Sequence, residues 1–252
     1  MRVNATRLDL AGLITCILGP ASATTTCVLL HGFGAPGDDL VGLAAGLAGG
    51  VEFAAGGAGR LPGGTDAAVR FVVPEAPLEL GGLYGDSRAW WMIDLARLED
   101  DLRRGTLRDR RNEVPDGLPG ARAQVLRLID ELQARFSIAA GQLVLGGFSQ
   151  GAMLALDVAL HRDAPPAGLL LMSGTIVSEA EWQPRMRSLA GVPVVLSHGR
   201  NDGLLPFRVA ETLRDQLTAA GAIVDWQPFS GGHEIAGNVL DAAGRLLRAV
   251  GR

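Results

Sequence analysis

The stretch Leu143-Val144-Leu145-Gly146-Gly147-Phe148-Ser149-Gln150-Gly151-Ala152 decides the fold. Residues 143–145 are short and apolar like a buried strand, and residues 152–160 continue as an apolar helical segment. The pentapeptide between them matches the pattern G-x-S-x-G, in which a tight turn strains the backbone of the serine and flanking glycines let strand and helix approach. The stretch therefore predicts that Ser149 projects from a strand end as a nucleophile.

An ordinary strand-to-helix turn is the alternative interpretation, because this pentapeptide arises by chance in a chain with 35 glycines. The apolar segments on both sides favour the catalytic interpretation. The start of the following helix would also turn backbone N–H groups and the positive end of its dipole toward Ser149, which suits a developing oxyanion.

The rest of the chain repeats the alternation of strand and helix. Apolar strand-like runs occupy residues 6–10, 13–18, 27–30, 70–73, 169–172, 192–196 and 223–229. Helical spacing occupies residues 120–136, 206–219 and 235–250. This alternation predicts parallel strand pairing and a three-layer α/β sandwich with a mostly parallel central sheet.

The chain has 252 residues, of which 48% are hydrophobic, so residues 1–252 can fold around one core as a single domain. Two long segments fit neither strand nor helix. Residues 49–64 are rich in glycine and alanine and are expected to be a flexible insertion. Residues 74–92 follow a strand end, where α/β sheets bind ligands, so we expect them to contact substrate.

Charge and hydropathy exclude several classes of partner. A net charge of −4 and a pI near 5.6 leave no basic stripe for nucleic acid. No apolar run reaches the length of about 18 residues that a membrane-spanning helix needs, so stable membrane insertion is not expected. Cys16 and Cys27 lie in apolar, strand-like surroundings and are expected to be reduced, buried thiols.

The N-terminus allows two interpretations. Arg2 and Arg7, the apolar stretch of residues 11–19 and the small residues 21–23 superficially resemble a secretory signal, which would mean export. Asp9 and the shortness of the apolar stretch weaken that resemblance. We favour two leading strands and a cytoplasmic protein.

A serine hydroxyl needs a general base, and the chain offers four histidines. His31 and His198 each sit at a strand end directly before a glycine, where a structural hydrogen-bonding role is expected. His161 falls at the far end of the helix after Ser149, about 15 Å away at 1.5 Å per residue. His233 remains, on a loop with two preceding glycines, and is the predicted base.

The acid is expected between serine and histidine in the chain, which is the order Ser, Asp/Glu, His of this pattern. Asp202 fits best, because it follows a strand and a turn and precedes Pro206 at a helix start. A turn-forming or helix-capping aspartate is the alternative role for Asp202. Asp225 lies inside a strand and Glu179 begins a helix, so both are poorer candidates.

An oxyanion hole needs two donors, and the backbone N–H of Gln150 is the first. The turn His31-Gly32-Phe33-Gly34 follows an early strand, and the backbone N–H of Phe33 is the predicted second donor; an ordinary glycine turn is the alternative. Apolar side chains could wall a substrate groove or equally belong to the core. These are Trp90, Trp91, Met92, Leu204 and Leu205.

Together these residues resemble the carboxylesterase/phospholipase family of serine hydrolases, which includes the acyl-protein thioesterases and has the α/β-hydrolase fold. The resemblance rests on Leu30-His31-Gly32-Phe33-Gly34, Pro74 to Pro77 before Trp90-Trp91, Gly147 to Gly151, His198-Gly199-Arg200-Asn201-Asp202 with Pro206, and Gly232-His233-Glu234. These matches span most of the chain in the right order, although the glycine-rich insertion and the residues after Pro77 match loosely.

The resemblance implies a carboxylesterase that cleaves carboxylic esters or thioesters through an acyl-enzyme, without metal or cofactor. It implies Ser149 as nucleophile, Asp202 as acid, His233 as base, and Phe33 and Gln150 as oxyanion donors, with a small-molecule ester as substrate. A peptidase or lactone hydrolase with the same triad and a non-catalytic binding module are the alternatives. The sequence leaves the oligomeric state open, a homodimer included.

Overall fold

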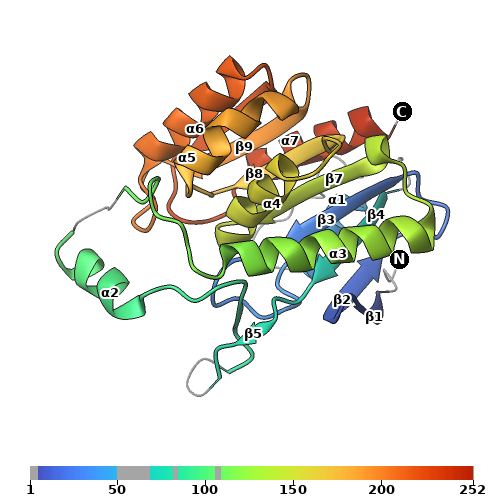
Figure 1. Cartoon of the computed structure of the whole chain (residues 1–252), viewed down its shortest axis with the longest axis horizontal. Coiled ribbons are helices and arrows are strands. Elements are labelled where there is room, and N and C mark those ends of the chain that lie inside the picture. Colours follow the sequence, from blue (N-terminus) through green and yellow to red (C-terminus); the bar gives the residue numbers. More distant parts are fainter. Residues whose placement is uncertain (1–4, 50–68, 82–84, 106–108, 252) are drawn as a thin grey trace.

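An eight-stranded sheet with the order β1-β2-β4-β3-β7-β8-β9-β10 runs through the computed structural model, which describes residues 5–49, 69–81, 85–105 and 109–251 (Figure 1). The strands are β1 (Thr6–Leu10), β2 (Leu13–Leu18), β3 (Thr25–Leu30), β4 (Val69–Pro74), β7 (Leu143–Phe148), β8 (Gly168–Met172), β9 (Pro193–Gly199) and β10 (Ile223–Phe229). Pairing is antiparallel between β1 and β2 and between β2 and β4, and it is parallel across the rest of the sheet.

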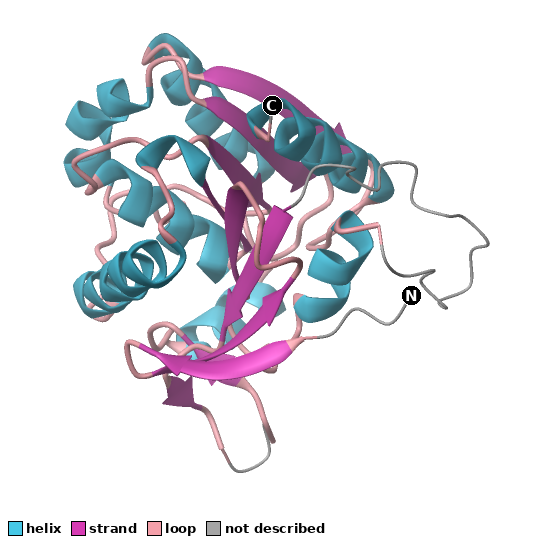
Figure 2. Cartoon of the chain, turned by 90° about the vertical axis from the view of Figure 1, so that its right-hand side faces the viewer, coloured by secondary structure: helices cyan, strands magenta, loops and turns pink. Residues whose placement is uncertain are grey.

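Helices cover both faces of this sheet (Figure 2). One face carries α3 (Leu118–Phe136), α4 (Gln150–Leu160), α5 (Glu179–Trp182), the 3₁₀ helix η3 (Gln183–Leu189) and α6 (Phe207–Ala219). The other carries α1 (Val41–Leu47) and α7 (Gly237–Val250). The predicted three-layer α/β fold with a mostly parallel sheet is confirmed.

The strand sequences explain why both faces are covered. In β3, Val28 and Leu30 pack into one apolar cluster, whereas Cys27 and Leu29 pack into the cluster on the opposite face. Successive side chains of a strand point to opposite faces, so a continuously apolar strand needs a layer on each side. The central strands therefore hold their carboxyl ends, where the candidate site lies, on a rigid support.

Most predicted elements are present with slightly different ends. The helices α1 and α2 (Leu95–Arg103) were not predicted, because α1 is short and α2 is strongly polar, whereas α5 begins at Glu179 as expected. Residues 74–92 contain a two-stranded hairpin of β5 (Leu78–Glu79) and β6 (Arg88–Ala89). Of the glycine-rich segment predicted at 49–64, residues 50–64 lie outside the described residues.

Residues 6–18 form the first two strands of the sheet, as the structural interpretation of the N-terminus predicted. Cys16 and Cys27 are both buried and free, and their strands β2 and β3 lie on either side of β4. Among the described residues, no helix combines the length and apolar character needed to cross a membrane.

Candidate active site

Ser149 occupies the tight turn between β7 and α4. Its backbone has φ 53° and ψ −116°, a conformation that residues other than glycine rarely adopt. A Cβ atom added to Gly151 would lie 1.9 Å from the Leu30 carbonyl oxygen, and one added to Gly147 would lie 2.5 Å from the same atom. The two glycines thus let α4 and β3 meet at the turn, and the strain at Ser149 is maintained by the surrounding packing.

The side chains of Ser149, His233 and Asp202 form a continuous hydrogen-bonded chain. His233 Nε2 lies 2.8 Å from Ser149 Oγ, and His233 Nδ1 lies 2.7 Å from Asp202 Oδ2. Because a carboxylate only accepts hydrogen bonds, His233 Nδ1 carries the proton and Nε2 is free to accept one from the serine hydroxyl. This arrangement can take a proton from Ser149 as its oxygen attacks a carbonyl carbon.

Asp202 is held ionised by four donors. Its Oδ1 accepts hydrogen bonds from the backbone N–H groups of Leu204 and Leu205 at 2.8 and 2.9 Å. Its Oδ2 faces His233 and also His198 Nε2, which lies 3.2 Å away. Burial alone would raise the pKa of Asp202, but the hydrogen bonds from His198, His233 and the Leu205 N–H together hold it well below its ordinary value. The carboxylate that bonds His233 Nδ1 is therefore negatively charged.

The loop that carries Phe33 lies against the turn of Ser149. A Cβ added to Gly32 would lie 3.3 Å from Phe148 Cδ1 and 3.4 Å from Ser149 Cβ, so the loop packs closely against the serine turn. Phe33 and Gln150 line the same cavity as Ser149. Gln150 is the first residue of α4, where the backbone N–H has no carbonyl acceptor within the helix. The two predicted oxyanion donors thus belong to residues that lie at the same cavity as the serine.

His31 holds this loop in place, as its predicted structural role requires. Its Nδ1 donates to the Gly32 carbonyl at 2.8 Å, and its Nε2 accepts from the Ala76 N–H at 3.0 Å. Burial lowers the pKa of His31, which keeps the ring neutral in this tautomer. Trp90 Nε1 donates to the His31 carbonyl at 3.0 Å and so ties the loop to the segment after β6.

The Gln150 side chain connects the serine turn to the same segment. Its Oε1 accepts from the Trp90 N–H and its Nε2 donates to the Trp91 carbonyl, both at 2.9 Å. These paired bonds fix the backbone next to Trp91, whose side chain lines the cavity. One residue therefore offers its backbone N–H beside Ser149 and positions a cavity wall with its side chain.

The cavity above Ser149 has a volume of about 340 Å³. Its floor is formed by the serine turn and its walls are mostly apolar. The apolar side chains include Phe33, Trp91, Met92, Ile93, Val114, Phe148, Met153, Val177, Leu204 and Leu205. Within the described part of the chain, no group of three or more His, Cys, Asp or Glu side chains is placed to hold a metal ion. The cavity thus suits an apolar group attached to a carbonyl that reaches Ser149.

Sequence comparison matches residues 65–250 to the family model described as phospholipase/carboxylesterase. This match covers well over half of the chain and includes Ser149, Asp202 and His233. The chain belongs to the phospholipase/carboxylesterase family. It is a hydrolase of the esterase and thioesterase type.

Two of the proteins similar to this chain are named as a thioesterase and an esterase. Acyl-protein thioesterase 1 of Neurospora crassa is 28% identical over 179 residues, which cover 69% of this chain and 71% of that protein. The crystal structure of esterase PE8 superposes with a TM-score of 0.71 at 26% identity and covers 99% of this chain and 100% of that one. TT1662 from Thermus thermophilus superposes with a TM-score of 0.69 at 19% identity over 100% and 99% of the two chains, which shows the shared fold.

One predicted cavity residue of this hydrolase lies elsewhere. Trp91, Met92, Leu204 and Leu205 line the cavity as expected, but Trp90 does not. Trp90 is buried in the core beside the α3 layer, because its indole N–H bonds to the His31 carbonyl and turns the ring inward. Trp90 therefore supports the loop of Phe33 and does not line the cavity.

Sequence reasoning missed most of the wall formed by residues 93–97 and 110–115. These residues contribute one side of the cavity. Residues 110–115 are held on the body by backbone hydrogen bonds from Ser178 N–H to the Glu113 carbonyl and from Glu179 N–H to the Arg111 carbonyl, at 2.9 and 2.8 Å. Pro115 was the available signal, since a proline shortly before a predicted helix often marks the end of a loop.

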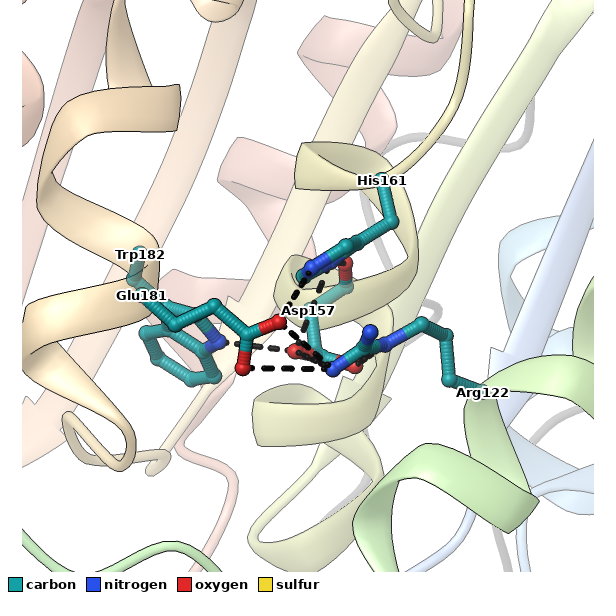
Figure 3. Close-up of polar contacts among 5 residues, drawn as sticks. All are labelled: Arg122, Asp157, His161, Glu181 and Trp182. Atoms are coloured by element: carbon teal, nitrogen blue, oxygen red, sulfur yellow. Dashed lines mark hydrogen bonds and ion pairs between the residues drawn. The ribbon is translucent and has the colours of Figure 1, made fainter.

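His161 belongs to a separate polar cluster, remote from Ser149 as predicted (Figure 3). The cluster links α3, α4 and α5 through Arg122, Asp157, His161, Glu181 and Trp182. Asp157 accepts from Arg122 Nε at 2.6 Å and from Trp182 Nε1 at 2.8 Å. His161 Nδ1 faces the Asp157 carbonyl at 2.7 Å and Nε2 faces Glu181 at 2.8 Å. Each residue of this cluster contacts at least one residue of a neighbouring helix.

Proposed function

We propose that this hydrolase is a carboxylesterase that cleaves carboxylic esters, thioesters included, through an acyl-enzyme on Ser149. The observation that supports this most strongly is the distance of 2.8 Å from Ser149 Oγ to a His233 nitrogen whose other ring nitrogen is bonded to Asp202. The position of this group at the floor of an apolar cavity adds to the support.

In the first half of the reaction, Ser149 Oγ forms a bond to the carbonyl carbon while its proton moves to His233 Nε2. The carbonyl oxygen becomes an oxyanion and accepts hydrogen bonds from the backbone N–H groups of Phe33 and Gln150. His233 then gives its proton to the leaving alcohol or thiol as the carbon–oxygen or carbon–sulfur bond breaks. The acyl group remains bonded to Ser149.

Water reverses these roles in the second half. His233 takes a proton from water as the water oxygen bonds to the acyl carbon, and it returns that proton to Ser149 Oγ as the acyl bond breaks. Asp202 stays ionised throughout and stabilises the protonated form of His233. The products are a carboxylic acid and the free enzyme.

The cavity walls favour a substrate with an apolar acyl or alcohol part. Met92, Val114 and Leu204 are exposed side chains at this cavity, with exposed fractions of 59%, 58% and 40%. Burying them against a hydrocarbon group would gain about 25 cal/mol per Å². The relatives named acyl-protein thioesterase 1 make a thioester the second bond to test.

Replacing Ser149 with alanine tests the proposal. We expect Ser149→Ala to lower kcat for p-nitrophenyl butyrate by several orders of magnitude with an unchanged melting temperature, and to abolish labelling by a fluorophosphonate probe. Ser22→Ala is the matched control, because Ser22 is exposed and far from the cavity in the fold. Near wild-type turnover by Ser149→Ala would overturn the proposal.

A substrate panel separates the proposed activity from its alternatives. Esters of graded acyl length, one thioester, one anilide and one lactone should be compared by kcat/KM. We expect the esters and the thioester to be cleaved fastest. Dominant cleavage of the anilide or the lactone would indicate a peptidase or lactone hydrolase, and folded protein without labelling at Ser149 would indicate a binding module.

A further inference from the structure

His198 makes a contact with Asp202 that the proposed reaction does not use. The ring is fully buried near the end of β9, and its Nε2 lies 3.2 Å from Asp202 Oδ2 and 3.1 Å from the Leu205 carbonyl oxygen. Within the described residues, its Nδ1 is buried with no hydrogen-bond partner. Asp202 Oδ2 therefore faces two imidazoles, those of His233 and His198.

The partners of His198 fix its protonation. Both atoms that face Nε2 are acceptors, so Nε2 carries a proton and donates it. A second proton on Nδ1 would bury a charged ring with an unpaired N–H, which is unfavourable. His198 therefore has an Nε2–H donor that lies between the Leu205 carbonyl oxygen, at 3.1 Å, and Oδ2 of the acid of the proposed triad, at 3.2 Å.

Two donors on one oxygen compete for its negative charge. His233 Nδ1, at 2.7 Å, is the closer donor to Asp202 Oδ2, and His198 is the more distant. Each hydrogen bond stabilises the ionised carboxylate and lowers the pKa of Asp202. A carboxylate with an extra donor attracts a protonated imidazole less strongly than one without it.

We propose that His198 is a positioning residue of this hydrolase, holding Asp202 Oδ2 in line with His233 Nδ1 and limiting how strongly the carboxylate stabilises protonated His233. The inference rests on the proposed function for its effect on turnover, whereas the effect on His233 itself can be measured without turnover. A base that is too strongly stabilised in its protonated form is inactive at neutral pH and a poor donor to the leaving group.

The charged groups around His233 and His198 stay the same when His198 is replaced, so a changed titration of His233 can be assigned to His198. Glu234 follows His233 in the same loop, and the charged residues that line the cavity are Asp39, Asp94, Arg97, Arg110 and Glu113. The His198 ring packs against Phe207 of α6, with 6.1 Å between the ring centroids. The guanidinium of Arg200 lies over the Phe207 ring. Substitution of His198 changes none of these groups.

Two variants distinguish the donor from simple packing. His198→Phe keeps an aromatic ring but has no donor, whereas His198→Gln keeps a side-chain N–H. We expect His198→Phe to move the acidic limb of the kcat/KM profile upward by about 0.5–1 pH unit and to lower kcat at pH 8 by about tenfold or more, with little change in KM. His198→Gln should recover most of both losses.

NMR separates this proposal from the proposed function. In the Ser149→Ala background, ¹⁵N resonances of His233 report its titration without turnover, and the His198→Phe change should raise that titration midpoint relative to His198→Gln. Equal midpoints and equal kinetics for the two variants would overturn the positioning role, whatever Ser149→Ala does to hydrolysis. If His198→Phe fails to fold, His198→Met supplies the variant without a donor and the same outcomes decide.

Discussion

Two buried aspartates in this protein each hold a histidine, yet only one of these pairs is arranged for chemistry. Asp202 bonds His233, whose second nitrogen faces a serine hydroxyl in a cavity. Asp157 lies beside His161, whose two nitrogens both face acceptors, the Asp157 carbonyl and Glu181. The side chains of Asp202 and Asp157 are both 0% exposed.

The difference shows that burial and a carboxylate partner do not make a histidine a base. Both nitrogens of His161 already face an acceptor, so neither is open to a substrate or to a serine hydroxyl. His233 must carry a proton only on Nδ1, and its Nε2 lone pair meets a hydroxyl that substrate can reach. A histidine can act as a base here only if one ring nitrogen keeps a lone pair that faces the cavity, as His233 Nε2 does.

Removing each histidine gives the largest expected contrast. His233→Ala should lower kcat by roughly four to six orders of magnitude and leave the melting temperature near that of wild type. His161→Ala should instead lower the melting temperature, because Glu181 and the Asp157 carbonyl lose their donor, and it should leave kcat of the folded protein unchanged. Ester turnover and thermal unfolding, measured on both variants, check the pair. A large loss of kcat in folded His161→Ala would remove the contrast.

Changing Asp202 to asparagine should lower kcat by about 10⁴-fold through the tautomer of His233. Asp202 Oδ1 accepts from the N–H groups of Leu204 and Leu205, so the amide nitrogen of an asparagine would take the place of Oδ2. It would donate to His233 Nδ1 and move the ring proton to Nε2, which then cannot accept from the serine.

Steady-state kinetics with a p-nitrophenyl ester measure this loss, and ¹⁵N shifts of His233 report the tautomer. Asp225→Asn is the matched control, because Asp225 is a partly exposed residue on β10. A folded Asp202→Asn enzyme with near wild-type kcat would mean that the carboxylate does not orient the base.

Asp157 should show the opposite balance between activity and stability. Replacing Asp157 with asparagine removes the closer and fully buried charged partner of the Arg122 guanidinium, which is only 15% exposed, and leaves it the partly exposed Glu181. We expect the free energy of unfolding to fall by about 3 kcal/mol while kcat changes less than about twofold. Urea unfolding and ester turnover measure both, with exposed Asp215→Asn as the control. Equal stability for Asp157→Asn and wild type would show that the cluster contributes nothing.

Local sequence patterns predicted the parts of this molecule that depend on neighbouring residues. The strand, glycine turn and helix around Ser149 could be predicted because their geometry is set by adjacent residues. His233 lies 84 residues from Ser149, and it was found through the chain order of the pattern and the poor placement of the other histidines. The family resemblance supported the same assignment.

Contacts between distant segments were not predictable in this way. Trp90 and Trp91 are adjacent, and only the bond from Trp90 Nε1 to the His31 carbonyl decides which ring enters the core. The second donor on Asp202 was missed because a histidine before a glycine at a strand end does not reveal what its ring meets. The wall of residues 110–115 depends on backbone hydrogen bonds to residues 178 and 179, and the local sequence gives no sign of them.

The smallest expected effect is the pH dependence that Glu181 adds to the Asp157 cluster. Burial raises the pKa of Glu181, but the hydrogen bond from His161 and the charge of Arg122 lower it below its ordinary value overall. A carboxylate with a lowered pKa in the folded state stabilises the fold above its unfolded pKa, and this stabilisation is lost as the pH falls through the folded value.

Because the Glu181 side chain is 36% exposed, solvent screens the interaction, and we expect Glu181→Gln to cost less than about 1 kcal/mol at pH 7. The difference in unfolding free energy between wild type and Glu181→Gln should therefore shrink between pH 6 and pH 3. A difference that grows over this interval would mean that Glu181 does not stabilise the fold as a carboxylate.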